Sequence, residues 1–367
     1  MVMRITFVLP AFWVVPSGGY RVVYEYANHL TGRGHQVSVV HPRSLVEYRP
    51  PNLYRRLRRR GGRFRDAFFP PKVGWQPIDR RVQMLWVPDL RPHYVPDADA
   101  IFATAWETAG CVLGYPASKG NKFYLVQDFG PWFGPGEQLE ETWRWPLKKV
   151  TVSNWLYEKV RGAGASQNDV VNIPNGVDHK RFKLIVGARR APGTIAMYYG
   201  DLEYKSVEDG LDALRKVQAS FPHLAVTLFG HKDPTADRLP PWIAHRGRVR
   251  EMELVKIYNE SRIFVSSSAA EGFALPPAEA MACGCAVALT DSGGIREFAE
   301  DGVTALLSPP RDPAALARNI ARLLDDDDLR QQLAAAGHRR IQEFTWDRST
   351  DQLMQFIQRH VVKGDEK

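Results

Sequence analysis

Two glutamates with seven residues between them are the groups in this sequence best suited to binding sugar hydroxyls. Glu271 and Glu279 flank the stretch 272–275 and the pair Pro276 and Pro277. An ionised carboxylate accepts hydrogen bonds from two hydroxyls at once, which suits a sugar ring or a ribose. Prolines favour the first turn of a helix, because their missing N–H groups would have no intrahelical partner there. The spacing therefore predicts a loop that carries Glu271 and a helix that carries Glu279.

The start of that predicted helix is also suited to an anion. Backbone N–H groups at a helix N-terminus lack intrahelical acceptors, and the helix dipole adds a partial positive charge. The residues that would present these groups are Gly272, Phe273, Ala274 and Leu275. From the residues alone, an ordinary loop–helix junction with two surface glutamates is an equal alternative.

A lysine in the same half of the chain offers a matching positive charge. Lys205 follows the predicted strand 194–199, after Gly200 and Asp201. A cation at that place would stabilise the charge that develops on a departing phosphate. A solvated surface charge is the alternative for any single lysine.

Two side chains in the first half of the chain could face the same site from the other side. Trp106 follows the predicted strand 100–103 and could stack on the face of a sugar, with core packing as the alternative. Asp128 follows the predicted strand 122–126 and could orient a hydroxyl that accepts the sugar.

The elements that must position these groups are short apolar runs alternating with helix-length amphipathic stretches. The predicted strands are 4–9, 36–41, 82–87, 100–103, 122–126, 150–153, 194–199, 225–229, 262–265, 286–289 and 305–307. The predicted helices are 19–31, 207–221, 251–260, 313–324 and 329–343. Such alternation is typical of βαβ units with parallel sheets, and ligands bind beyond the carboxyl ends of their strands.

This alternation starts twice, on either side of a stretch rich in turn-forming and charged residues at 174–193. We therefore predict an α/β protein with two doubly wound Rossmann-like domains that face each other across a cleft. The predicted domains are 1–175 and 176–344.

Composition agrees with a globular protein of two domains. The chain has 367 residues, of which 44% are hydrophobic and 25% charged. Its three cysteines suggest neither a disulfide framework nor a four-ligand metal site, so free thiols in a reducing cytoplasm are expected. The apolar N-terminal run suits a first strand better than a signal peptide, and no run approaches the roughly 18 apolar residues of a membrane span. We expect a soluble, cytoplasmic protein.

The net charge of +8 is unevenly distributed, with seven arginines between Arg55 and Arg65. Such a cluster could hold the protein at an anionic membrane, at the inner face, or it could be a solvated loop. Nothing in the pattern predicts nucleic-acid binding. The aspartates at 325–328 lie between two predicted helices, so they are expected to cap a helix rather than bind a metal.

The segment from Glu271 to Glu279, within E-G-F-x-L-P-x-x-E-A-M-A, resembles the E-x7-E motif of GT-B glycosyltransferases, and most closely the retaining family GT4. Further similar stretches occur in the family's order along nearly the whole chain. They are Gly18-Gly19, the run 30–39, the N-G-V-D at 175–178 with Phe182, and the run 289–297. The stretches 127–133 and 149–155 resemble a subgroup that includes rhamnosyltransferases of surface polysaccharides.

The resemblance implies a metal-independent, retaining transfer of a sugar from a nucleotide-diphosphate sugar to a hydroxyl acceptor, with no other cofactor. Glu279 would hold the donor ribose, and Glu271 would bind sugar hydroxyls near the reacting carbon. Glu271 and Lys205 would be the catalytic residues. The backbone of 272–275 would contact the sugar and the diphosphate. The glycines of the other donor-side loops would let the backbone approach the phosphates, and these are Gly18, Gly19 and Gly200.

The same resemblance implies that the last helix, 345–362, crosses back to complete the N-terminal domain, which would bind the acceptor through Trp106 and Asp128.

One departure from the family concerns its phosphate clamp, which usually reads G-R-x-x-x-x-K. Asp201 stands in the place of the arginine, and Lys205 comes one residue early. The arginines that could substitute are Arg248, Arg250 and Arg296. Two alternatives stay open: a catalytically impaired homologue that binds nucleotide sugars, and a sugar-nucleotide epimerase of the same fold. A dehydrogenase is disfavoured because no G-x-G-x-x-G follows a strand.

Overall fold

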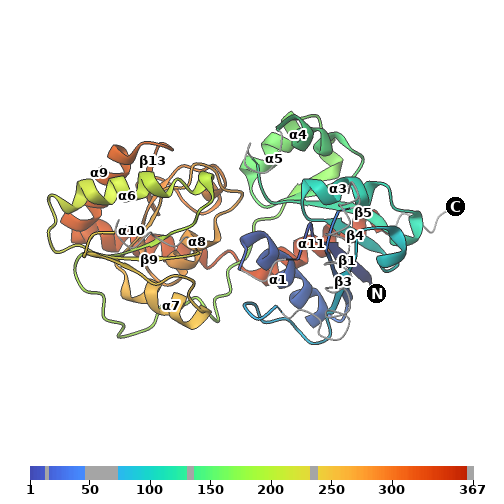
Figure 1. Cartoon of the computed structure of the whole chain (residues 1–367), viewed down its shortest axis with the longest axis horizontal. Coiled ribbons are helices and arrows are strands. Elements are labelled where there is room, and N and C mark those ends of the chain that lie inside the picture. Colours follow the sequence, from blue (N-terminus) through green and yellow to red (C-terminus); the bar gives the residue numbers. More distant parts are fainter. Residues whose placement is uncertain (13–15, 46–72, 130–135, 232–238, 362–367) are drawn as a thin grey trace, which may run out of the picture.

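The structure of the protein is a computed structural model that describes residues 1–12, 16–45, 73–129, 136–231 and 239–361. Figure 1 shows two lobes side by side, each built around its own sheet. The arginine cluster between Arg55 and Arg65 lies outside the described residues. Among the described residues, no helix is long and apolar enough to cross a membrane.

The N-terminal lobe contains a seven-stranded sheet in the order β3-β2-β1-β4-β5-β6-β7. Its strands are β1 Arg4–Val8, β2 Gln36–Pro42, β3 Gln83–Val87, β4 Ala100–Ala103, β5 Asn121–Val126, β6 Lys148–Thr151 and β7 Val170–Asn172. All neighbouring strands are parallel, with Ile5 of β1 opposite Val37 on one side and Ala100 on the other. Helices cover both faces of such a sheet, which is why its strands read as continuous apolar runs.

The C-terminal lobe repeats this plan with a six-stranded parallel sheet in the order β10-β9-β8-β11-β12-β13. Its strands are β8 Thr194–Tyr198, β9 Ala225–Phe229, β10 Ile243–His245, β11 Ile263–Ser266, β12 Ala286–Thr290 and β13 Leu306–Ser308. In both sheets the first strand of the lobe lies in the interior and the order reverses beside it. The predicted fold of two doubly wound Rossmann-like domains is therefore confirmed.

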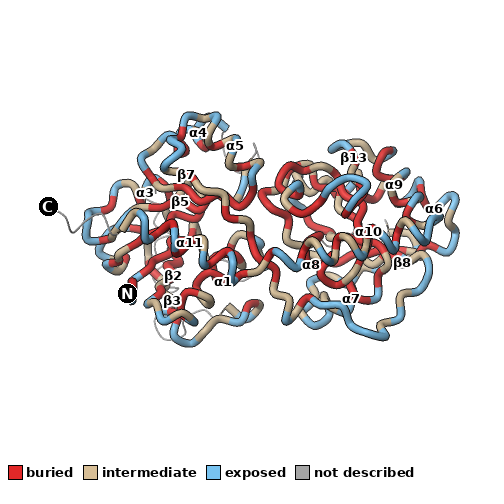
Figure 2. Tube along the Cα trace, turned by 180° about the vertical axis from the view of Figure 1, so that it is seen from behind, coloured by how far each residue is buried: buried red, intermediate tan, exposed pale blue. Residues whose placement is uncertain are grey.

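Ten α-helices of the described residues cover the two sheets. They are α1 Gly18–Gly32, α3 Trp106–Leu113, α4 Gly136–Arg144, α5 Asn154–Gly162, α6 Val207–Gln218, α7 Glu251–Glu260, α8 Leu275–Ala282, α9 Pro313–Asp325, α10 Asp327–Ile341 and α11 Trp346–Val361. The aspartate run between α9 and α10 caps a helix as predicted, since the Asp326 side chain accepts a hydrogen bond of 2.8 Å from the Leu329 N–H. Figure 2 shows buried residues concentrated along the strands and where the lobes meet.

The chain passes between the lobes at two places that lie side by side. Helix α11 follows the C-terminal lobe but packs against α1, with the Trp346 and Tyr26 rings edge to face at 5.4 Å. The Val177 N–H donates to the Phe344 carbonyl at 3.0 Å. Gly176 lies so close to the second crossing that a Cβ on it would be 2.2 Å from the backbone nitrogen of Trp346. The two crossings therefore lie in contact at one place between the lobes.

The lobes also touch through α5, away from these crossings. Glu297, in the C-terminal lobe, accepts a hydrogen bond from the Asn154 N–H at the start of α5. A Cβ on Gly293 would lie 2.4 Å from the ring of Trp155, so the glycine lets α5 approach the loop after β12. These contacts place the ends of the two sheets opposite each other.

Candidate functional site

Glu271 lies in the loop between β11 and α8, which the neighbouring loop holds in place. Its N–H donates to the Ser292 carbonyl at 2.9 Å, and its own carbonyl accepts from the Gly294 N–H at 3.0 Å. Lys205 reaches the same point from the short turn after β8, and its Nζ donates to Glu271 Oε1 at 2.6 Å. The lysine and glutamate side chains are 13% and 12% exposed. The two predicted catalytic residues therefore meet at the carboxyl ends of two adjacent strands.

Two tyrosine rings enclose the Lys205 ammonium group. Its Nζ lies 5.5 Å from the centre of the Tyr198 ring and 4.9 Å from that of Tyr204, which are cation–π distances. Burial raises the pKa of both tyrosines, so both are neutral phenols at physiological pH. Tyr198 also lies over Gly200, where a Cβ would be 2.6 Å from the ring. Gly200 thus makes room for the ring that flanks the lysine.

The turn before α8 leaves the start of this helix uncapped by side chains. Ala274, the N-cap residue, adopts a left-handed backbone with φ 71° and has no polar side chain. Helix α8 begins at Leu275, and its first turn contains the two predicted prolines. The helix dipole and the N–H groups of 272–275 are therefore suited to an anion beside Lys205.

Gln127 is a site residue that sequence reasoning missed. Its carbonyl would be 1.7 Å from a Cβ on Gly272, and its side-chain Nε2 lies 3.4 Å from a Cβ placed on Gly19. Gln127 therefore lies between two loops predicted to bind the donor, while a Cβ on Gly18 would meet nothing within 4 Å. Gln127 Oε1 is buried and has no hydrogen-bond partner among the described residues. The sequence signal that could have identified Gln127 as a site residue is its position just after β5 and before Asp128.

Asp128 belongs to the N-terminal lobe and lies close enough to the Lys205–Glu271 pair for both of their charges to act on it. The Asp128 side chain is exposed to solvent. Neighbouring groups nevertheless displace enough of the water around its carboxyl to raise its pKa to about 7. The charge of Glu271 adds to this effect, and Lys205 opposes it. The predicted acceptor-side carboxylate therefore changes its protonation near neutral pH, next to the predicted catalytic pair.

Trp106 is placed differently. It opens α3 and packs, partly buried, against the core of the N-terminal lobe. Its Nε1 is buried without a hydrogen-bond partner among the described residues. These are the contacts of the core-packing alternative, and a contact with sugar stays a prediction.

Glu279 projects from α8 and is only 3% exposed. Its Oε1 forms an ion pair with Arg21 of α1, in the other lobe, and its Oε2 accepts from the Tyr258 hydroxyl at 3.4 Å. Burial raises the pKa of the Glu279 carboxyl, and the positive charge of Arg21 opposes that rise. The glutamate predicted to hold ribose thus already has one partner from each lobe.

Asp201 has a partner that its sequence neighbours do not reveal. Its carboxylate lies 2.9 Å from His231 Nε2, and the other ring nitrogen lies 3.0 Å from the Tyr198 hydroxyl. Of the candidate arginines, Arg296 is engaged by Asp291 with a nitrogen–oxygen distance of 2.9 Å. Arg248 is close enough to counteract the rise in the pKa of Tyr198, and Arg250 precedes α7 as its N-cap residue.

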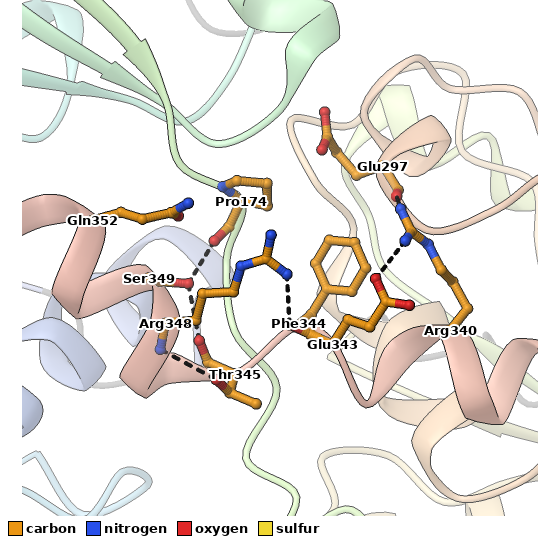
Figure 3. Close-up of a pocket in the computed structure, with 9 residues that line it drawn as sticks. All are labelled: Pro174, Glu297, Arg340, Glu343, Phe344, Thr345, Arg348, Ser349 and Gln352. Atoms are coloured by element: carbon orange, nitrogen blue, oxygen red, sulfur yellow. Dashed lines mark hydrogen bonds and ion pairs between the residues drawn. The ribbon is translucent and has the colours of Figure 1, made fainter.

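A hollow lies where the chain crosses between the lobes, and none of these residues lines it. Figure 3 shows Arg340, Phe344 and Arg348 around it, with the Ser349 hydroxyl donating to the Pro174 carbonyl at 2.6 Å. Among the described residues, no group of three or more His, Cys, Asp and Glu side chains is arranged to hold a metal ion.

Comparison with known proteins gives the site its context. The family model described as "Glycosyl transferases group 1" matches residues 193–326. A phosphatidyl-myo-inositol mannosyltransferase of Mycobacterium tuberculosis is 26% identical over 96% of each chain. An O-antigen chain mannosyltransferase B of Escherichia coli is 34% identical over 30% of this chain and 29% of its own.

Solved structures agree on the fold. A sucrose-phosphate synthase from Thermosynechococcus elongatus superposes with a TM-score of 0.72 at 19% identity, covering 98% of this chain and 100% of its own. Anabaena Alr3699/HepE, solved in complex with UDP and glucose, gives 0.72 at 15% identity, covering 97% and 100%. The narrower resemblance to rhamnosyltransferases stays a prediction. The chain therefore has the GT-B fold, and residues 193–326 of its C-terminal lobe are similar to the group 1 glycosyltransferases.

Proposed function

We propose that the protein transfers a sugar from a nucleotide-diphosphate sugar to a hydroxyl acceptor, with retention of configuration at the anomeric carbon. The observation that carries this proposal is the contact of 2.6 Å between Lys205 Nζ and Glu271 Oε1, beside the start of α8. A cation, a carboxylate and a helix N-terminus in one place supply the groups that a phosphorylated sugar needs.

In this proposal the C-terminal lobe stabilises the leaving diphosphate. Negative charge grows on the phosphate as the bond to the sugar breaks, and fixed donors lower the energy of that state. Lys205 and the N–H groups at 272–275 would supply such donors. Glu271 would accept hydrogen bonds from sugar hydroxyls near the reacting carbon. The departing phosphate would take the acceptor's proton, and no metal or other cofactor is needed.

Glu271 and Glu279 do not serve as the two carboxyl groups of a glycoside hydrolase. Such groups lie on opposite sides of the scissile bond. Here both glutamates belong to one loop and helix of the C-terminal lobe, on the donor side. Transfer to an acceptor held by the other lobe is therefore favoured over hydrolysis.

The N-terminal lobe would hold the acceptor near Asp128. Above its pKa of about 7 the Asp128 carboxylate can accept a hydrogen bond from a second hydroxyl of the acceptor, which leaves the proton of the attacking hydroxyl for the departing phosphate. The close approach of Gly272 to Gln127 shows that the two walls can meet, which would exclude water during transfer.

The relatives support a lipid or glycan acceptor. Their names, a phosphatidyl-myo-inositol mannosyltransferase and an O-antigen chain mannosyltransferase, refer to these two kinds of molecule. We propose an acceptor of this kind and, for a lipid, contact with an anionic membrane through the arginines at 55–65, in polysaccharide or glycolipid synthesis on the cytoplasmic side.

An impaired homologue stays a second candidate because Asp201 replaces the clamp arginine. The contact between Asp201 and His231 weakens this alternative, since it engages the carboxylate that would otherwise repel a diphosphate. An epimerase would convert the donor with no acceptor present, which separates it from a transferase.

Thermal unfolding with UDP, GDP, dTDP and ADP tests the donor site. A nucleotide present at about 100 times its dissociation constant should add roughly 2.7 kcal/mol to the stability of the folded protein. We expect one nucleotide to stabilise the wild type and to do so less in Lys205→Met. Lys216→Met, which changes an exposed lysine of α6, is the control. Failure of all four nucleotides to raise the unfolding temperature would contradict the proposal.

A further inference from the structure

A tyrosine and a histidine connect Lys205 to Asp201, the residue that stands in the place of the family's clamp arginine. The Tyr198 hydroxyl lies 3.0 Å from His231 Nδ1, and His231 Nε2 lies 2.9 Å from Asp201 Oδ1. The centre of the Tyr198 ring lies 5.5 Å from Lys205 Nζ. The Asp201–His231–Tyr198 network therefore ends at the cation that the proposed function assigns to the diphosphate.

The fold brings Tyr198 and His231 together at the carboxyl ends of two neighbouring strands. Tyr198 is the last residue of β8, and His231 follows the end of β9 by two residues. In the sheet, Tyr198 is paired in register with Phe229. Gly230 approaches β8 so closely that a Cβ on it would be 2.0 Å from the Tyr199 carbonyl oxygen. This close approach places the imidazole within reach of the phenol hydroxyl.

Both ring nitrogens of His231 are engaged within the network. An imidazole nitrogen carries either one proton or one lone pair, so each nitrogen has room for one hydrogen-bond partner. An ionised carboxylate only accepts, so Nε2 donates to Asp201 and the contact fixes the orientation of the ring. His231 as placed therefore acts on the site through Tyr198 and not by binding a phosphate.

The Tyr198 ring is held along its whole length. Its Cβ belongs to β8, and its hydroxyl meets His231 Nδ1. The ring lies over Gly200, where a Cβ would be 2.6 Å from a ring carbon and 2.8 Å from the hydroxyl oxygen. Phe229 packs against it edge to face, with the ring centres 6.0 Å apart. A ring held in this way presents a constant face to Lys205.

Lys205 needs a partner that stays in place when the donor binds. In the proposed function Lys205 contacts the diphosphate and Glu271 accepts from sugar hydroxyls, so both partners of their 2.6 Å contact gain bonds to the ligand. The negative face of the Tyr198 ring continues to attract the ammonium group in that state. Tyr204 belongs to the same short turn as Lys205 and moves with it, whereas Tyr198 belongs to the sheet.

We infer that His231 is a positioning residue for the donor diphosphate, because it fixes the Tyr198 ring that holds the Lys205 ammonium group in place. The family's clamp uses an arginine and a lysine. In this protein a single lysine, held by the Asp201–His231–Tyr198 network, takes that role. The inference rests on the proposed function of Lys205, and the ligand concerned is a nucleoside diphosphate.

The test is titration calorimetry on the full chain, with the nucleotide among UDP, GDP, dTDP and ADP that binds the wild type. His231→Phe keeps an aromatic ring but loses both hydrogen bonds, and Tyr198→Phe removes only the hydroxyl. Each should lower the affinity about fivefold, because holding the ring without its hydrogen bond costs about the free energy of one such bond. If His231→Phe does not fold, Tyr198→Phe tests the same bond by itself.

A background without the lysine separates positioning from direct contact with the ligand. In Lys205→Met the Tyr198 ring has no ammonium group to hold, so adding Tyr198→Phe or His231→Phe should change the affinity by less than about twofold. His231→Asn should stay within about twofold of the wild type. Asparagine carries an amide oxygen about where histidine carries Nδ1, and this oxygen can accept from the Tyr198 hydroxyl.

A second histidine beside β9 gives a matched control. His223 is exposed and precedes β9 by two residues, at the opposite end of the strand from His231. His223→Phe makes the same substitution away from Lys205, so it should leave the affinity unchanged.

Wild-type affinity in either Tyr198→Phe or a folded His231→Phe overturns the inference. A fivefold loss that persists in the Lys205→Met background overturns it as well, because the altered residue would then contact the ligand itself. If none of the four nucleotides binds the wild type, the donor site itself fails, and the proposed function with it.

Discussion

The two glutamates of one nine-residue motif lie in opposite environments. Glu271 sits in a loop, 12% exposed, and pairs with Lys205 from its own lobe. Glu279 sits about one turn inside α8, is 4% exposed, and pairs with Arg21 from the other lobe. Both are carboxylates with a single cationic partner, but only the first faces the cleft beside Asp128.

Glu271 therefore lies where the proposed function puts the donor sugar, whereas Glu279 helps to hold the two lobes together. The Lys205–Glu271 pair lies in one rigid lobe, so a ligand can exchange partners there without moving a domain. The Arg21–Glu279 pair spans both lobes and belongs to a buried network, so losing it removes a contact that helps to fix their relative position. Disrupting the Arg21–Glu279 pair should therefore change mainly the free energy of unfolding, and disrupting the Lys205–Glu271 pair should change mainly kcat.

The largest expected effect is on stability, at the pair between the lobes. Removing one partner of a buried ion pair leaves an uncompensated charge and costs about 3–5 kcal/mol. We expect Arg21→Met to lower the free energy of unfolding by an amount in this range, measured by urea denaturation at pH 8. Lys205→Met should cost less, because the Glu271 side chain that it leaves unpaired is 12% exposed, against 4% for Glu279. Equal losses in the two variants would remove the distinction between the pairs.

The next effect is on turnover, at the pair that faces the cleft. If Glu271 orients the sugar in the transition state, Glu271→Gln should lower kcat by about 100-fold or more, as the loss of a transition-state contact does. Its unfolding temperature should stay near that of the wild type. Glu260→Gln, which changes a half-exposed carboxylate at the end of α7, is the matched control. A Glu271→Gln enzyme within threefold of wild type would show that this carboxylate is not part of the chemistry.

A smaller effect should appear in the dependence on pH, at the carboxylate opposite the Lys205–Glu271 pair. The pKa of Asp128 is raised to about 7, mainly because neighbouring groups displace part of the water around this exposed side chain. Its ionised form is the hydrogen-bond acceptor, so kcat should rise with pH through about 7 and level off above it. In Asp128→Asn the profile should be flat over the same range, with a lower plateau.

The same residue affects stability with a defined sign. Between about pH 4 and 7 the folded protein keeps a proton on Asp128 that the unfolded chain has lost, so this group makes stability fall as pH rises. Asp128→Asn should therefore be more stable than wild type at pH 8 and about equal at pH 4. A difference that is the same at both values would mean that Asp128 titrates normally.

Features that depend on short stretches of sequence could be predicted, whereas contacts between residues far apart in the sequence could not. The doubly wound sheets, the loop before α8 and Lys205 follow from local patterns, and the structure contains them. The strands β7 and β10 have three residues each, of which only two are apolar, whereas β13 has the same length but was recognised because Ala305 extends its apolar run to three residues. The partner of Glu279 is 258 residues away, so no spacing rule could identify Arg21. Gln127 was hidden because its importance lies in backbone approach to a glycine of the other lobe.

The smallest expected effect concerns Asp201, which contrasts with both motif glutamates because it is 63% exposed. An exposed ion pair contributes about 0–1 kcal/mol, so Asp201→Asn should hardly change the free energy of unfolding. The affinity for a nucleoside diphosphate should nevertheless rise a few-fold, because a negative charge near the diphosphate is removed. Calorimetry at low and high salt measures this gain, which should shrink as salt screens the charge. A loss of affinity would instead show that Asp201 helps the site, by holding His231 beside Tyr198.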